Sequence, residues 1–194
     1  MRRSVALALL ILSLVLSLGP AGLVGSASAR PAPADERAGT GLLITARAWG
    51  KLERGMTVRQ AQRTGMVSKH PDHCAPGYLL TKPYLERGDI YWGYSPKPWT
   101  VHQIIVTGRR DHTRHGSHPG TRLGRLRHQN PQLSKVVSAG SLRGVHQRPD
   151  LWLAYVQKSY GTITFQFPYG QKPTRSSRVQ MIIVSSKPTY YFGC

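Results

Sequence analysis

A short segment that occurs twice in the chain constrains its fold more than any other feature. Residues 55–65 align without gaps with residues 120–130, and both copies begin with glycine. In the first copy, Thr57 is followed three residues later by Gln60, the spacing of a capping box at a helix start. The second copy ends before Pro131, whose ring disfavours helical geometry in the preceding residue. The pattern predicts two equivalent short helices.

Each predicted helix offers only a narrow apolar stripe, so both need a sheet to pack on. Three strand-like runs follow each helix, at residues 78–84, 90–94 and 101–107, and at 151–157, 162–167 and 179–185. In the run 162–167, apolar side chains alternate with Thr162, Thr164 and Gln166, which is typical of an antiparallel sheet covered on one side only. The predicted fold class is α+β. It comprises two related units, each a short helix followed by about three antiparallel strands, with the helices on one face of the sheet.

The first unit is expected at residues 42–108 and the second at 120–194, joined by a His- and Arg-rich linker at 109–119. Residues 1–29 have the pattern of a signal peptide, namely a positive start, an apolar run and a small-x-small cleavage site at Ala27-Ser28-Ala29. Residues 30–41 are expected to be a disordered leader. No later stretch approaches the roughly 20 apolar residues of a membrane helix. We therefore expect a secreted, extracellular protein without a transmembrane segment.

The repeated segments also carry a resemblance to a known family. Residues 52–65 followed by Cys74, and residues 120–126 followed by Asn130-Pro131, resemble secreted actinobacterial proteins built from a tandem helix-plus-sheet unit, with an architecture like that of the beta-lactamase inhibitory proteins. The resemblance implies an α+β fold with a concave sheet face used for protein binding. Those inhibitors carry a small disulfide inside each repeat, which this chain lacks. No inhibitor contact loop matches position by position, so inhibition of a beta-lactamase is not implied.

The two cysteines, Cys74 and Cys194, are expected to form an intramolecular disulfide, because an even pair usually bonds in an oxidising compartment. Two free thiols or an intermolecular bridge are the alternatives.

The balance of charge is strongly basic, with 27 Lys and Arg against 8 Asp and Glu and a formal net charge of +19. Such a surface attracts anionic wall polymers, anionic lipid and nucleic acid without demanding a particular shape. The alternative is that arginine is simply abundant and covers a solvated surface. Polyanions are expected to bind non-specifically under either interpretation.

A cluster of histidines marks the linker. His112, His115 and His118 have a spacing that can converge on Zn²⁺ or Cu²⁺, and Asp111 lies beside them. Neighbouring arginines oppose a divalent cation, so a solvated linker without a metal is the preferred interpretation, and no cofactor is expected.

The aromatic residues Trp92, Tyr94 and Trp99 are the candidate binding residues. Exposed Trp and Tyr among Arg and Lys are typical of a binding surface, because they supply a large rigid area with a polar group. Burial in the core is the alternative for each ring.

No catalytic signature stands out, and the carboxylates are scattered. We predict a secreted, non-enzymatic binding protein that engages an extracellular or envelope macromolecule through an aromatic and cationic sheet surface. An inhibitor-like role is one version of this hypothesis. The alternative is a cell-envelope polyanion-binding protein. A third hypothesis is a small basic nuclease using His102, His112 and His128.

Overall fold

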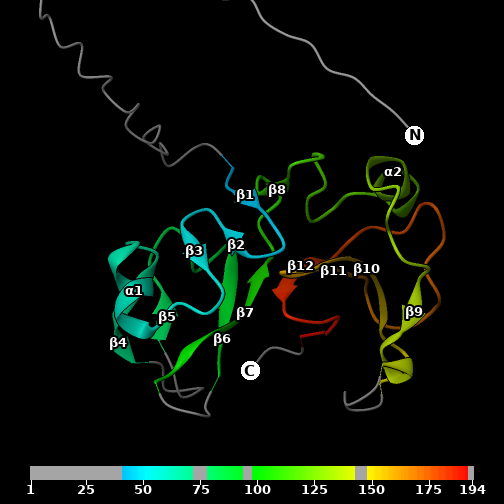
Figure 1. Ribbon diagram of the computed structural model, residues 1–194. Coiled ribbons are helices and arrows are strands. Elements are labelled where there is room, and N and C mark those ends of the chain that lie inside the picture. The colour runs from blue at the N-terminus through cyan, green and yellow to red at the C-terminus, as the bar shows by residue number, and fades with distance from the viewer. Residues whose placement is uncertain (1–40, 72–77, 94–97, 143–147, 192–194) are drawn as a thin grey trace, which may run out of the picture. The chain divides into compact units, whose positions relative to one another are not determined.

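The computed structural model describes residues 41–71, 78–93, 98–142 and 148–191 (Figure 1). The fold is α+β, with few helices and several mostly antiparallel sheets. In the described residues, no helix is long and apolar enough to cross a membrane. Cys74, Cys194, Tyr94 and the predicted signal peptide and leader lie outside these residues, so the disulfide, the role of Tyr94 and export stay predictions.

A six-stranded antiparallel sheet is the largest element. Its strands are, in spatial order, β6 (Gly88–Gly93), β7 (Thr100–Val106), β12 (Met181–Ser185), β11 (Gly161–Gln166), β10 (Trp152–Lys158) and β9 (Val137–Ser138). Strand β12, from the end of the described chain, inserts between β11 and β7, and its Ile183 faces Ile105 of β7. Strand β6 lies beyond β7 on one side, and β10 and β9 lie beyond β11 on the other.

Two smaller sheets complete the strands. A four-stranded sheet contains, in spatial order, β3 (Leu52–Glu53), β2 (Ala48–Trp49), β1 (Leu43–Ile44) and β8 (His112–Thr113). A two-stranded sheet pairs β4 (Val67–Pro71) with β5 (Tyr78–Leu80). The predicted strand at 78–84 therefore ends early and does not join the large sheet. The short strands β1 to β4 and β8 were not predicted.

Both predicted helices are present, as α1 (Val58–Arg63) and α2 (Leu123–Gln129), and a 3-10 turn η1 (Ala139–Ser141) follows β9. Thr57 and Gln60 form the predicted capping box, and Gly65 takes the predicted left-handed conformation with φ 77°. Ala61 of α1 and Leu126 of α2 are buried in the same apolar core.

The backbone before each helix makes the same contacts with a strand far along the chain. Gly55 N–H donates to the carbonyl of Val101 at 2.8 Å, and Gly120 N–H donates to that of Val179 at 2.7 Å. Val101 N–H returns a bond to Met56, as Val179 N–H does to Thr121, both at 2.9 Å. Both glycines have a positive φ, 83° and 96°. The aligned segments therefore occupy equivalent local environments.

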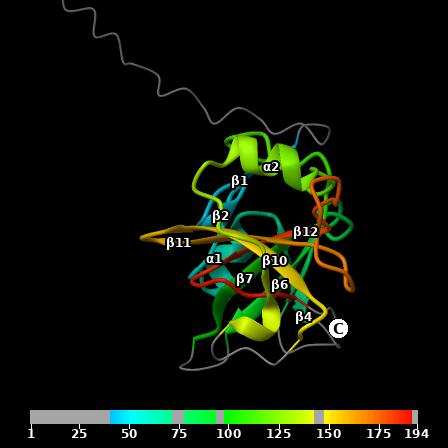
Figure 2. The same cartoon turned by 90° about the vertical axis from the view of Figure 1, so that its right-hand side faces the viewer.

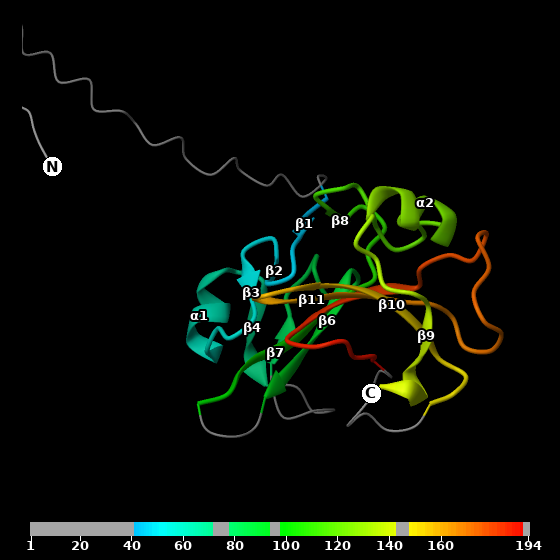
Figure 3. The same cartoon turned by 45° about the vertical axis from the view of Figure 1, so that its right-hand side comes forward.

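Both faces of the large sheet are covered at β11, which corrects the expectation of one solvated face for this strand. Thr162, Thr164 and Gln166 alternate with the apolar residues of β11 as predicted, yet all three are buried. The Gln166 amide donates to the carbonyl of Tyr191 (3.1 Å) and accepts from its N–H (3.0 Å). The segment after β12 thus crosses the face opposite α2 (Figures 2 and 3). These bonds satisfy the buried amide of Gln166, whereas the hydroxyl of Thr164 is buried without a hydrogen-bond partner among the described residues.

Candidate functional site

The predicted aromatic residues do not all reach the surface. Trp92 is only 3% exposed and belongs to the main core, which is the alternative that the sequence left open for this ring. Alternation along β6 explains the difference, because Ile90 and Trp92 face the core while Tyr91 points to the other side. Tyr91 is 42% exposed, and Trp99 is half-buried.

The predicted linker is packed rather than solvated, which is a second correction. Its strand β8 pairs in parallel with β1, and Thr113 and Ser117 are buried. Asp111 is fully buried, where it accepts a hydrogen bond from the N–H of Leu42 at 2.7 Å and forms an ion pair with Arg87. Asp111 therefore holds the backbone and does not orient a histidine.

The three histidines of this segment do not assemble a metal site. Nδ1 of His112 lies 3.1 Å from the carbonyl of Arg110, and Nδ1 of His118 lies 2.8 Å from that of Pro119. His115 is exposed. Throughout the described residues, no three His, Cys, Asp or Glu side chains are grouped so that they could hold a metal ion.

A buried polar network fixes the turn after β8 against the end of α2. Ser117 Oγ donates to Gln129 Oε1 at 3.0 Å and accepts from Asn130 Nδ2 at 2.9 Å. The amide of Asn130 also reaches the carbonyl of Leu126 at 3.0 Å, and the hydroxyl of Thr113 accepts from the N–H of Ser117. These bonds hold Arg114 and His115, the exposed residues of the turn, in one place.

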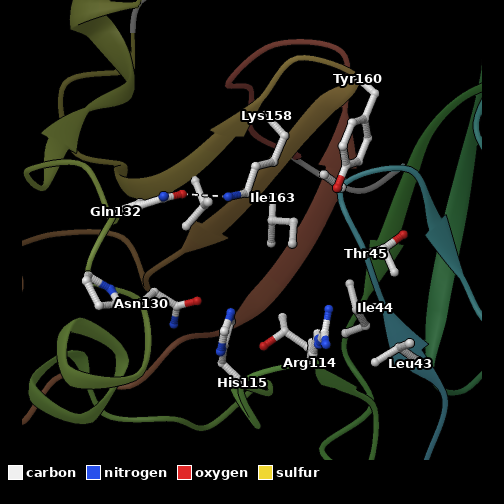
Figure 4. A pocket seen from close by; sticks show the side chains of 14 residues that line it. Leu43, Ile44, Thr45, Arg114, His115, Asn130, Gln132, Lys158, Tyr160 and Ile163 are labelled. Atoms are coloured by element: carbon white, nitrogen blue, oxygen red, sulfur yellow. Dashed lines mark hydrogen bonds between the residues drawn. The ribbon is translucent and has the colours of Figure 1, made fainter. Parts of the chain in front are cut away.

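Arg114 and His115 line a groove of about 720 Å³ between β1, the β8 turn, the end of α2 and the hairpin of β10 and β11. Its floor is apolar and includes Ile44, Val156 and Ile163. Figure 4 shows Lys158 and Tyr160 on the opposite side of the groove from Arg114 and His115. This volume lies within the usual range of about 300–1,000 Å³ for ligand sites.

The charge around the groove has one sign. Arg114, His115 and Lys158 line it, and none of its lining residues is Asp or Glu. Lys158 Nζ donates to Gln132 Oε1 at 2.5 Å, which holds the ammonium group at the groove, and no carboxylate of the described residues forms a salt bridge with it. An occupant that combines an apolar group with an anionic one would match both the floor and the rim.

The hairpin tip that carries Tyr160 packs tightly against the chain after β1. A Cβ on Gly161 would lie 2.1 Å from the carbonyl oxygen of Ala46, so only glycine permits this approach. The carbonyl of Tyr160 accepts a long bond of 3.5 Å from Arg54. These contacts fix the width of the groove at this end, while the Tyr160 side chain stays 57% exposed.

A second group of cations lies near Arg54. Burial, and to a lesser degree Arg47, lower the pKa of Arg54. Burial is also the main cause that lowers the pKa of His102, with Arg54 and Lys187 adding repulsion. His102 contacts the ring of Tyr91 edge-on, with the ring centroids 6.3 Å apart. The neutral imidazole is therefore favoured at this position.

Sequence reasoning missed the groove as a whole. Its residues come from four separate segments, and each segment by itself is an ordinary mixture of apolar and basic residues. Arg114 and His115 belong to the predicted linker and Asn130 to the predicted helix stop, and nothing in the sequence connects them with Ile44 or Ile163.

The chain matches no protein-family model and no curated protein. Among solved structures, it is similar to the uncharacterized protein yfeY from Escherichia coli, with 17% sequence identity and a TM-score of 0.43. The match covers 75% of this chain and 99% of that one. Similarity at this level supports no inference about function.

Proposed function

We propose that the protein is a secreted, non-enzymatic binding protein that holds a segment of an extracellular protein partner in the groove between β1, α2 and the hairpin of β10 and β11. The observation that carries the proposal is an apolar floor bordered by cations and an exposed tyrosine, without any lining carboxylate. The preferred segment presents an apolar side chain next to an acidic one.

Each part of the groove has a role in this binding. Ile163 and Val156 take up the apolar side chain, since its removal from water supplies the main driving force. Lys158 and Arg114 attract the acidic side chain from opposite sides. Tyr160 adds rigid contact area at the rim, as tyrosine does in many protein interfaces. The proposal keeps the predicted aromatic and cationic surface but assigns it to different residues.

A peptide-display selection on the folded chain tests this function. We expect the selected peptides to carry an apolar residue beside Asp or Glu, and to lose affinity for Ile163→Asp and Tyr160→Ala. A loss of about 2 kcal/mol, close to thirtyfold in Kd, is typical when a central contact is removed. Tyr169→Ala is the matched control, because Tyr169 is 42% exposed but lies outside the groove. Peptides that bind the Ile163→Asp variant unchanged would contradict the proposal.

We also propose that the two halves of the chain are related units, as the aligned segments predicted. The matching contacts of Gly55 and Gly120 support this relation. Two isolated antiparallel bridges support it as well, because each joins a helix N-cap to a distant residue. Thr57 pairs with Thr100 at the start of β7, and Arg122 pairs with Arg178 shortly before β12. An experimental structure in which the halves superpose as helix plus strands would test it. Superposition limited to the two bridges would contradict it.

The nuclease hypothesis draws no support from the described contacts. His102, His112 and His128 would have to act as acid or base, yet in the described residues no hydrogen bond joins any of them to a carboxylate or to one another. The polyanion alternative is favoured by a group of exposed arginines near the start of α2, the end of the helix away from the groove.

A further inference from the structure

Two arginines face each other across the bridge at the start of α2. Arg122 and Arg178 are antiparallel partners, flanked by the bonds from Leu123 N–H to Ser177 (2.8 Å) and from Val179 N–H to Thr121 (2.9 Å). These flanking bonds identify a non-hydrogen-bonded pair, the kind in which Cα atoms are about 4.5 Å apart and side chains lie closest. Like charges directly opposite each other destabilise such a pair.

Two further arginines lie at the same place. The guanidinium of Arg178 donates to the carbonyl of Gly120 at 2.8 Å, and the side chain of Arg109 lies against that glycine, with Nε 3.7 Å from where a Cβ would be. The carbonyl of Arg175 accepts a bond from the N–H of Gly124 at 2.9 Å. Arg109, Arg122, Arg175 and Arg178, here called the arginine cluster, are all exposed. The loop that carries Arg175 and Arg178 runs beside α2 (Figure 1).

No carboxylate compensates the arginine cluster in the described part of the chain. Three of the described acidic residues are already paired with other arginines: Glu53 with Arg47, Asp111 with Arg87 and Asp150 with Arg148. Asp89 binds the hydroxyl of Tyr191, and no salt bridge among the described residues involves the cluster. Its charge is therefore open to an external anion.

The backbone arrangement does not require arginine at these positions. The bridge at the start of α1, where Val101 N–H donates to Met56 as Val179 N–H does to Thr121, pairs Thr57 with Thr100. Thr57 also caps its helix through its side chain, whereas Arg122 at the corresponding N-cap makes no side-chain cap bond. Arg122 thus lacks a capping bond and faces a like charge, so helix capping does not account for arginine there, although Arg178 itself bonds the carbonyl of Gly120.

We propose that the arginine cluster binds phosphate groups of a phosphodiester polymer, at a site separate from the groove and independent of its function. Arginine suits this chemistry, because its planar fork can donate two hydrogen bonds to one phosphate and keeps its charge at any physiological pH. A polymer fits better than a single ion, since several exposed cations engage a chain of charges and release its counterions.

Binding of two phosphodiester polymers, single-stranded DNA and poly(glycerol phosphate), is measured against salt for the unsubstituted chain and for Arg122→Gln/Arg178→Gln. Loss of two phosphate contacts is expected to reduce the slope of log K against log salt by about 1.4 for a single strand. The matched control is Arg59→Gln/Arg63→Gln, which removes the same charge from exposed positions of α1. Hyaluronate, a carboxylate polymer, is the third probe.

The expected result is a large loss of affinity for the cluster variant with both phosphodiester polymers, and little change for the α1 control. If one of the two polymers alone depends on the cluster, that polymer identifies the source of the phosphate groups. Equal losses in the two variants would overturn the proposal in favour of general charge attraction. If hyaluronate binding depends on the arginine cluster as strongly as binding of the phosphodiester polymers does, the preference for phosphate is overturned.

A second variant separates binding from folding. Arg122→Thr/Arg178→Thr copies the residues of the first bridge, and threonine is a much better N-cap than a residue that makes no cap bond. This variant is expected to melt at the same or a higher temperature than the unsubstituted chain while binding the polymers as weakly as the glutamine variant. Polymer binding that survives in this folded variant would overturn the proposal.

Discussion

Arg87, directly before β6, and Asp111, after β7, form a largely buried ion pair. Asp111 is fully buried and also accepts the N–H of Leu42, so its carboxylate joins two regions that are far apart in sequence.

Asp111→Ala should therefore destabilise the protein strongly. The substitution leaves the Arg87 guanidinium and the Leu42 N–H without their partner, and breaking a buried pair in this way costs about 3–5 kcal/mol. Chemical denaturation measures the change. Asp150→Ala is the control, since it breaks a solvent-exposed pair with Arg148 and should leave the unfolding midpoint almost unchanged. Similar midpoints for the two variants would contradict the structural role of Asp111.

Trp92 and Tyr91 are neighbours on β6, but their truncation to alanine should change the stability of the protein by very different amounts. Trp92→Ala leaves a cavity in the core and is expected to cost about 3–5 kcal/mol of stability. Tyr91→Ala removes an exposed ring and should change stability little. Thermal melts of both variants check the prediction. A destabilised Tyr91→Ala beside an unchanged Trp92→Ala would mean that the strand presents its other face to the core.

His102 should make stability fall on acidification. Burial, Arg54 and Lys187 lower its pKa from the usual 6.5, so the unfolded chain takes up the proton at a higher pH than the folded protein does. The contribution of the neutral ring is present above about pH 6.5 and is lost as the pH falls below that value. His102→Gln should flatten this part of the pH dependence measured by denaturation. The control His128→Gln, at an exposed helix position, should leave the pH dependence of stability as it is. An unchanged pH dependence in His102→Gln would show that His102 is not its source.

The bridge between Cys74 and Cys194 is the fourth prediction. Peptide mass spectrometry of the non-reduced protein should find the two cysteines linked. Cys74→Ser is expected to lower stability by about 4–5 kcal/mol, because the bridge closes a long loop of the unfolded chain. Two free thiols, or a dimer that reduction dissociates, would rule out an intramolecular bond.

Local signals predicted the helices well. The Thr57–Gln60 capping box, the left-handed Gly65 and the stop before Pro131 all depend on residues within a few positions of each other, and each appears in the structure. The strands β7, β10 and β11 were likewise placed to within a residue or two, because each is long enough for its side chains to show a pattern.

The parts that the sequence did not predict depend on distant partners. Strands of two residues, such as β1 and β8, have no periodicity, and their pairing joins Leu43 to His112. A linker containing Asp111 looks solvated until Arg87 and Leu42 are placed beside it. The groove could not be foreseen for the same reason, since Ile44, His115 and Ile163 come together only in the folded chain.

The pairing of β7 with β12 has a consequence for fragments of the protein. The residues that the two strands pair with each other are isoleucine and valine, and β12 covers the edge of β7 that faces away from β6. A fragment that ended before β12 would present β7 as an unpaired apolar edge, which is a template for aggregation or for exchange with a second chain. Because β12 is the last strand of the described chain, the edge of β7 is covered on this side only once β12 has paired with it.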